Sequence, residues 1–202
     1  MKAEKQNYNL HIRVNIDESN KNEFISTARF FKERYKKKII VYPGFVDGIE
    51  GCKLSDCLLD RKKKSQFLIE LYKEHGVDVL GFYPDDYRYE CPVRSPYHHV
   101  IGPNGEFYKC WNDVGNQEKV IATLDKGVIN PILLNRYYVA GDPFDDKKCI
   151  DCIHIQTCGG GCPYLRIQNE FENKNIDTCD LIKDNLEEYL EIHYERIIKR
   201  NE

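Results

Sequence analysis

The sequence predicts an α/β fold in its first part, followed by a smaller α+β part that is rich in cysteine. Helix-like and strand-like apolar periods alternate through residues 1–84, and prolines and turn signals replace that rhythm from Asp85 onward. Seven of the nine cysteines lie between Cys91 and Cys179. We therefore expect a βαβαβ unit in 1–84, a cysteine-rich domain in 85–180 and an amphipathic helix in 181–202.

Residues 8–16 alternate apolar and polar side chains at period two, which predicts a strand with one buried face. Asp17 or Ser19 can then cap a helix over residues 20–37. The apolar stripe of this helix, which predicts packing against a core, consists of Phe24, Ile25, Ala28, Phe31 and Tyr35.

The next apolar run, residues 38–42 before Pro43, is typical of a strand buried on both faces in a parallel sheet. After a loop that holds Cys52 and Cys57, a second amphipathic helix is predicted for residues 61–75 and should end at Gly76. Residues 77–82 then read as a third strand, which would complete a right-handed parallel βαβαβ unit.

The second part predicts shorter elements. Residues 98–110 indicate a β-hairpin in which Asn104 and Gly105 supply the positive-φ residues of a tight turn. A short strand is expected over 120–124 and a short helix over 130–138. Residues 181–199 predict a long helix whose apolar stripe is Ile182, Leu186, Leu190, His193 or Tyr194, and Ile197.

Composition excludes several classes of protein. The chain has 202 residues, 41% of them apolar and 12% aromatic, which is enough to bury a core. A formal net charge of −3 gives no basic excess that would favour nucleic acid or an anionic membrane. No apolar run approaches the roughly 18 residues of a membrane span, and the first residues lack the apolar core of a signal peptide. We therefore expect a cytoplasmic protein with no nucleic-acid or membrane partner.

Four cysteines lie close together in the second half of the sequence, in the order Cys149-x2-Cys152-x5-Cys158-x3-Cys162, and Cys179 follows them. Closely spaced thiolates suit iron–sulfur clusters or tetrahedral zinc. Disulfides are the competing interpretation, but thiols in a reducing cytosol are more often metal-bound or catalytic. The three glycines before Cys162 allow positive φ and close approach of backbone N–H groups to a cluster's sulfurs.

Together with an upstream Cys91-x13-Gly105-x4-Cys110, this pattern closely resembles the SPASM module. That module is the C-terminal extension of many radical S-adenosylmethionine (radical SAM) enzymes that modify peptides and proteins. The resemblance extends from Cys91 to Cys179. The predicted βαβαβ unit is similar to the later strands and helices of the family's partial (β/α)6 barrel, by order and position more than by motif.

The resemblance implies two auxiliary [4Fe–4S] clusters with interleaved ligands. The first would take Cys91, Cys110 and Cys162, and the second would take Cys149, Cys152, Cys158 and Cys179. The fourth position of the first cluster would be open or filled by Asp85, Asp86, Cys52 or Cys57, although Cys52 and Cys57 also fit ordinary loop thiols. Because each cluster joins distant segments, its binding would contribute folding free energy.

One departure limits the resemblance. The family's catalytic cluster sits on Cys-x3-Cys-x2-Cys, and no three cysteines here have that spacing. We therefore expect the C-terminal part of a larger enzyme with no catalytic residues of its own, in which S-adenosylmethionine binds only once an N-terminal half or partner supplies the missing cluster. By position, Arg13 and Asn15 match the family's cofactor-holding residues, although they also fit the polar side of an amphipathic strand.

The leading hypothesis is thus a cluster-binding domain that relays electrons or binds a peptide or protein substrate. An electron donor would supply the electrons. An alternative is a stand-alone redox or scaffold protein, but a half barrel would leave an unpaired sheet edge. A second alternative is a structural zinc module built on the second cysteine set. Tyr108 and Trp111, beside Cys110, are expected to shield the first cluster from water.

Overall fold

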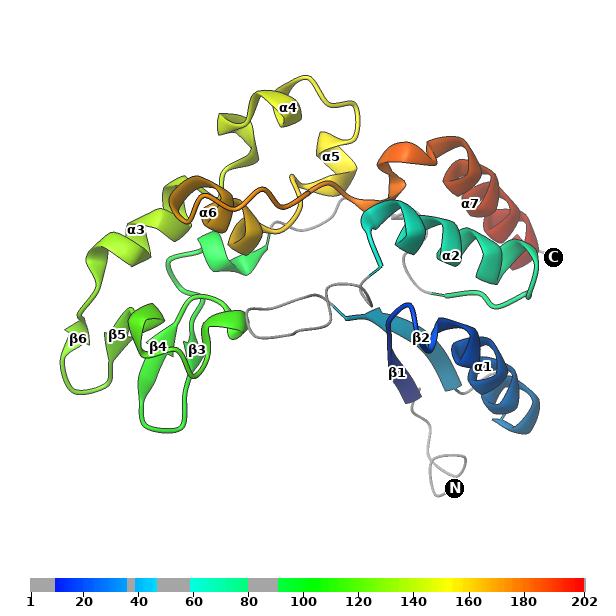
Figure 1. The fold of residues 1–202 in the computed structure, drawn as a ribbon, viewed down its shortest axis with the longest axis horizontal. Helices are drawn as coiled ribbons and strands as arrows, with labels where there is room; N and C mark the ends of the chain where they lie inside the picture. Colours follow the sequence, from blue (N-terminus) through cyan, green and yellow to red (C-terminus); the bar gives the residue numbers. More distant parts are fainter. Residues whose placement is uncertain (1–9, 36–38, 47–58, 80–90, 202) are drawn as a thin grey trace. The chain divides into compact units, whose positions relative to one another are not determined.

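The computed structural model describes residues 10–35, 39–46, 59–79 and 91–201. In these ranges the chain is a mixed α/β protein with seven α-helices and two small sheets (Figure 1). It divides into two compact units: Met1–Pro84 together with Leu181–Glu202, and Asp85–Asp180. The terminal segment, which was predicted as an amphipathic helix over residues 181–202, thus belongs to the first unit.

A parallel strand pair forms the sheet of the first unit. β1 (Leu10–Ile16) and β2 (Ile39–Phe45) pair from Leu10 opposite Ile39 to Ile16 opposite Phe45, with α1 (Lys21–Tyr35) between them in sequence. The alternation predicted for β1 is confirmed, because its burial alternates along the strand and Ile16 is buried. β2 continues through Pro43 instead of ending before it, and its residues are only partly buried apart from Val41 and Gly44.

Two helices cover the core-facing side of this sheet. In α1 the buried residues are Phe24 and Ala28, which belong to the predicted stripe. α2 (Arg61–Lys73) begins where Asp60 accepts a hydrogen bond from Lys63 N at 2.8 Å. It ends at Lys73, two residues before the predicted end, and Gly76 follows with a left-handed φ of +61° and an N–H that donates to the carbonyl of Tyr72.

The predicted third strand is not confirmed. Residues 77–79 have no regular secondary structure, and 80–82 lie outside the described residues, as do Cys52 and Cys57. Val77 and Val79 are nonetheless buried in the core of the first unit. The apolar run therefore reports burial rather than a strand, and a complete βαβαβ unit is not established.

The terminal helix differs in phase from the prediction. A 3₁₀ turn, η8 (Leu181–Asp184), precedes α7 (Leu186–Asn201), and between them Asn185 donates from Nδ2 to Oγ of Ser65 at 2.7 Å. In α7 the buried residues are Tyr189 and Ile192. The predicted stripe is wrong at Leu190, Tyr194 and Ile197, which are 43%, 65% and 41% exposed.

The second unit contains an antiparallel four-stranded sheet whose strands follow chain order. They are β3 (Val100–Ile101), β4 (Glu106–Tyr108), β5 (Ala122–Thr123) and β6 (Gly127–Val128). The hairpin between β3 and β4 confirms the prediction, but only Gly105 has a positive φ, +80°. With Pro103 at the second turn position and Gly102 accepting from Gly105 N at 3.1 Å, this is the pattern of a type I turn followed by a left-handed glycine.

Four helices and several 3₁₀ turns complete the second unit. α3 (Pro131–Val139) matches its prediction and is capped by Asn130, which accepts from Leu133 N. α4 (Lys147–Ile150), α5 (Ile155–Cys158) and α6 (Pro163–Phe171) carry or flank the cysteines. Buried residues from these turns, the sheet, α3 and α6 form one core: Val93, Cys110, Ile121, Ala122, Leu133, Tyr137 and Ile167.

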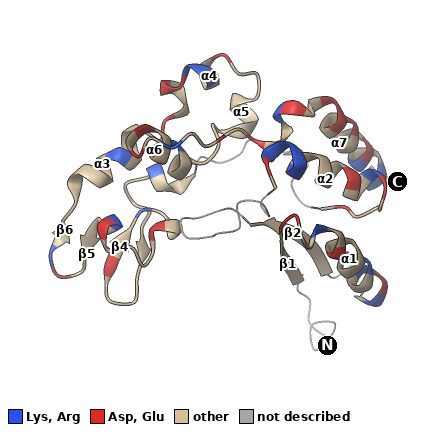
Figure 2. Cartoon of the chain, in the orientation of Figure 1, with Lys and Arg blue, Asp and Glu red and all other residues tan. Residues whose placement is uncertain are grey.

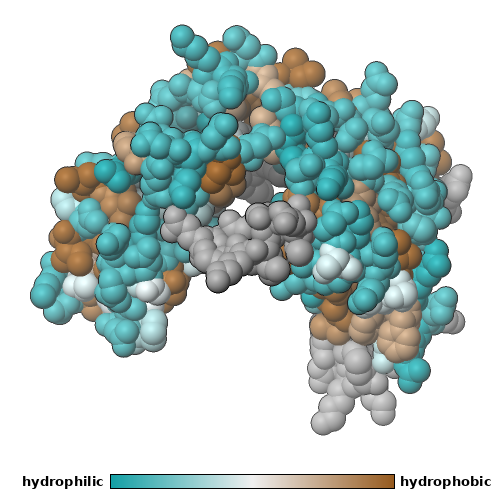
Figure 3. Space-filling view, viewed as in Figure 1, coloured by the Kyte–Doolittle hydropathy of each residue, from teal (hydrophilic) through white to brown (hydrophobic). Residues whose placement is uncertain are grey.

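Charged and apolar surfaces are distributed differently in the two units. Acidic and basic side chains mix along α7 (Figure 2), and Glu195 and Lys199 pair one turn apart at 3.5 Å. Hydrophobic surface lies over the end of the second unit that carries β5 and β6 (Figure 3), where Leu124 and Val128 are exposed. None of the helices in the described ranges combines the length and apolar character needed to cross a membrane.

Candidate metal centre

All seven cysteines of the motif lie in the second unit, and no disulfide joins them. Short elements position most of them: Cys91 precedes the 3₁₀ turn η4 (Pro92–Arg94), and Cys110 precedes another, η5 (Trp111–Asp113). Cys149 lies in α4, Cys158 ends α5, and Cys162 caps α6. The helix α6, which the sequence pattern did not predict, therefore begins at Cys162.

Three of these cysteines share one neighbourhood. Cys110 is buried in the core of the second unit, and Cys91 packs against that core. Burial raises the pKa of the Cys110 thiol to about 11; the N–H of Asn112 opposes the rise, and the charges of Asp113, Cys162 and Cys91 add to it. The three thiols assigned to the first cluster are thus close enough to interact electrostatically.

A glycine bend organises the other group of cysteines. Gly159, Gly160 and Gly161 have φ values of +63°, +82° and +77°, as the triple glycine predicted. The sulfur of Cys158 accepts hydrogen bonds from the backbone N–H groups of Gly160, Gly161 and Asp180. Burial still raises the pKa of this thiol. The bend therefore brings Cys158 beside the segment that contains Cys179.

Gly161 itself tolerates no side chain. A Cβ at this position would overlap the carbonyl oxygen of Thr178. Because Thr178 directly precedes Cys179, the close approach of the two backbones holds the last cysteine of the motif against the bend. This contact requires glycine for space as well as for its positive φ.

Arg166 links Cys149 to the glycine bend that follows Cys158. Its Nη2 donates to Sγ of Cys149 at 2.7 Å, its Nη1 to Oδ2 of Asp146 at 2.9 Å, and its Nε to the carbonyl of Gly160 at 2.6 Å. Burial lowers the pKa of the guanidinium, but the bonds to Cys149 and Asp146 outweigh it and the pKa is raised. This buried guanidinium therefore holds the Cys149 sulfur in a fixed position relative to Asp146 and the glycine bend.

The sulfurs do not form a closed tetrahedral site. Among the described residues, no group of three Cys, His, Asp or Glu ligand atoms that includes a cysteine lies within 4.8 Å. Zn–S bonds of about 2.3 Å would hold tetrahedral thiolates about 4 Å apart. The cysteines of the described residues therefore do not form a compact metal-ligand group in this structure.

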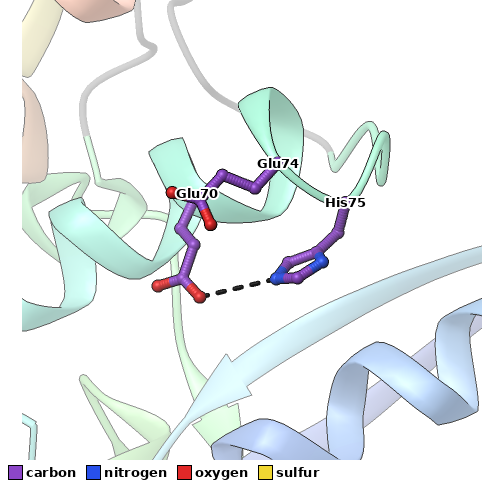
Figure 4. Close-up of side chains that lie close together, drawn as sticks. All are labelled: Glu70, Glu74 and His75. Carbon is purple, nitrogen blue, oxygen red and sulfur yellow. Dashed lines mark ion pairs between the residues drawn. The ribbon is translucent and has the colours of Figure 1, made fainter.

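Three ligand-type side chains also converge in the first unit, at the C-terminal end of α2 (Figure 4). The ligand atoms of Glu70, Glu74 and His75 lie within 4.8 Å of one another, and Nε2 of His75 is 3.5 Å from Oε1 of Glu70. Arg29 approaches Nδ1 of the same ring at 3.2 Å. Because a guanidinium only donates, Nδ1 must accept, and in the neutral ring Nε2 carries the proton that faces Glu70. Both nitrogens are engaged, so we assign this group to a polar network.

The remaining predicted site residues lie on the surface or outside the described ranges. Arg13 and Asn15 are exposed on the face of β1 opposite its core-facing side, and the Arg13 side chain lies across Gly44 of β2. Tyr108 is fully buried and Trp111 is 77% exposed, and shielding of a cluster by these two side chains stays a prediction. Asp85 and Asp86 fall outside the described residues.

Comparison with known proteins adds no family assignment. No protein-family model matches the chain, and a search of the curated proteins found no match.

Proposed function

We propose that this chain is the auxiliary-cluster portion of a radical SAM enzyme that modifies a peptide or protein. The first [4Fe–4S] cluster is held by Cys91, Cys110 and Cys162, and the second by Cys149, Cys152, Cys158 and Cys179. The observation that carries the proposal is the spacing of the seven cysteines, and the charges of Cys91 and Cys162 both act on the Cys110 thiol. The resemblance to the SPASM module implies the same grouping of these three residues from their spacing.

The interleaved assignment is supported by the glycine bend. Cys158 and Cys162 are four residues apart, a spacing that in a continuous helix would place both thiols on one face. Here three consecutive positive-φ glycines interrupt the helix between them. Cys158 faces the Asp180 backbone, whereas Cys162 interacts with Cys110. Neighbouring thiols are thereby directed to different centres.

The chain's own residues would hold anionic sulfur in place. Arg166 donates to Cys149, and backbone N–H groups donate to Cys158, the kind of hydrogen bond that tunes the reduction potential of iron–sulfur clusters. In the first group Cys110 is buried, Cys91 is half-buried and Cys162 is exposed. The clusters, when bound, supply one-electron transfer or an iron that ligates substrate.

Chemistry on S-adenosylmethionine belongs to the complete enzyme in this proposal. Arg13 and Asn15 lie side by side on the exposed face of β1 and remain the candidates for contact with that cofactor. The catalytic cluster comes from an N-terminal half or a partner, and reduction requires an electron donor. The proposal therefore includes the expectation that the chain alone forms no 5′-deoxyadenosine.

Iron counting on cysteine variants tests the proposal. Anaerobic reconstitution of the wild-type chain with iron and sulfide should give about eight irons per chain, from two four-iron clusters. Cys152→Ala and Cys162→Ala should each remove about four irons, and the double variant should retain none of the clusters.

Two results contradict this assignment. If the wild-type chain binds one zinc tightly and rejects iron, the second cysteine set is a structural zinc site. If either single variant loses all the iron while circular dichroism remains unchanged, the thiols serve one shared centre.

A further inference from the structure

Asp113 is a buried carboxylate with one unsatisfied oxygen. Its side chain is 1% exposed, and Oδ2 accepts a hydrogen bond from the hydroxyl of Tyr137. Oδ1 is fully buried and has no hydrogen-bond partner among the described residues. Leaving a buried acceptor unpaired costs about 1–3 kcal/mol, so such an atom calls for an explanation. A bound ion is one such explanation.

The neighbours of Asp113 leave Oδ1 unsatisfied. Lys119 and Glu172 act electrostatically on the carboxylate, but they form an ion pair with each other. The buried ammonium of Lys109 donates to the carbonyls of Ser95 and His98. Burial raises the pKa of Asp113, as expected for a carboxyl group without a cationic partner of its own.

Asp113 also belongs to the neighbourhood of the first cysteine group. It ends the 3₁₀ turn that Cys110 caps, and its N–H donates to the Cys110 carbonyl at 3.1 Å. Its charge acts on the Cys110 thiol together with the charges of Cys91 and Cys162. Cys110 and Asp113 have the same two-residue gap that separates Cys149 from Cys152. That gap lets two side chains converge on one inorganic centre.

We propose that Asp113 is the fourth ligand of the first cluster and binds iron through Oδ1. The inference rests on the proposed function and completes a ligand set of Cys91, Cys110, Cys162 and Asp113. Tyr137 is then a positioning residue, because its hydroxyl holds Oδ2 and thereby orients the carboxylate. A single oxygen ligand makes the first cluster chemically distinct from the all-thiolate second cluster.

The test uses the full chain, reconstituted anaerobically and then oxidised mildly. An iron held by a protein ligand stays in the cluster, whereas a three-ligand cluster loses its open iron and gives the electron paramagnetic resonance (EPR) signal of [3Fe–4S]. The wild-type chain should keep about eight irons. Asp113→Asn, which keeps the shape of the side chain, should fall to about seven irons and show that signal. Asp113→Cys should restore the wild-type result, because it creates a Cys-x2-Cys pair.

Glu172→Gln is the matched control, since it removes a nearby carboxylate that pairs with Lys119, and it should behave as wild type. The inference is overturned if Asp113→Asn keeps all its iron through oxidation, or if Asp113→Cys behaves as Asp113→Asn. It is also overturned if Cys52→Ala or Cys57→Ala alone produces the [3Fe–4S] signal, because one of those thiols is then the ligand. A wild-type chain that takes up no iron contradicts the proposed function itself, which distinguishes the two failures.

Discussion

Each of the two units of this chain is stabilised internally by a different kind of interaction. In the first, both described strands and three helices bury apolar side chains in one core, which includes Phe24, Phe67, Leu71 and Ile192. In the second, the core lies between the sheet, α3 and α6, while α4 and α5 contribute no buried residue. These two short helices carry Cys149 and Cys158. The cysteine segment is therefore positioned by Arg166, backbone N–H groups and a glycine bend.

These interactions indicate where each unit obtains its stability. Apolar burial is independent of any ligand, so the first unit should be stable without a metal. A segment held by polar contacts and left-handed glycines gains little net free energy from them, because each hydrogen bond replaces one to water. We therefore expect much of the stability of the second unit to come from cofactor binding.

Loss of apolar packing in the first unit should have the greatest effect on stability. Leu71 is fully buried, and Leu71→Ala should lower the free energy of unfolding by about 2–5 kcal/mol in urea denaturation. Leu190→Ala is the control, because Leu190 is 43% exposed and should change stability by less than about 0.5 kcal/mol. Iron content should stay at the wild-type level in both. If the two variants had equal effects, Leu190 would be part of a buried apolar stripe, as the sequence predicted for α7.

The next largest effect on stability is expected in the glycine bend, where two variants distinguish a steric clash from an unfavourable backbone φ. Gly161→Ala should cost about 2–4 kcal/mol, because it combines a left-handed φ with a clash against the Thr178 carbonyl. Gly159→Ala has the same sign of φ and open space, and should cost only about 1 kcal/mol. Iron analysis should show loss of the second cluster in the Gly161 variant alone. Similar iron contents in both variants would mean that the contact with Thr178 does not position Cys179.

A smaller effect is expected at Arg166. Arg166→Gln removes its charge-assisted bonds to Cys149 and Asp146, and should cost about 1.5–3 kcal/mol of stability without iron. In the reconstituted protein the midpoint potential of the second cluster should fall, because a positive charge beside a ligand sulfur has been lost. An unchanged potential, measured by EPR titration, would show that Arg166 serves folding only.

The smallest expected effect on stability comes from the helix caps, of which each unit provides one. Asp60 caps α2 in the first unit and Asn130 caps α3 in the second, and each accepts a hydrogen bond from a backbone N–H three residues on. Replacing either by Ala should cost about 1 kcal/mol in thermal unfolding. Iron loading should change the cost at Asn130 but not at Asp60. Identical behaviour of the two variants would argue against separate sources of stability.

Local periodicity predicted much of the fold. The strand at 10–16, the helices α1, α2 and α3, and the hairpin around Gly105 follow from spacing, caps and turn residues that act over a few positions. Val77 and Val79 misled because a short apolar run reports burial and not conformation. The buried face of α7 includes Tyr189, whose hydroxyl accepts from Ser65 of α2, a contact between residues distant in sequence that periodicity does not contain.

The same limit applies to the candidate site. Cysteine spacing was sufficient to identify the resemblance to the SPASM module, and that resemblance implies the two ligand sets. Arg166 and Asp113 were not found from the sequence, since a buried arginine and a buried aspartate are visible only once the segments around them are packed. The Cys-x2-Asp gap at Cys110 is the one sequence signal that pointed to Asp113.

Amide hydrogen exchange across the full chain, before and after anaerobic loading with iron and sulfide, can show whether the second unit depends on its cofactors. We predict that exchange slows by about tenfold or more in residues 91–113 and 146–180, while residues 10–35 and 61–79 change little. The second unit would then owe its stability to its cofactors and the first to its core. Equal protection of both units, or iron uptake that leaves 91–180 unchanged, would contradict this division.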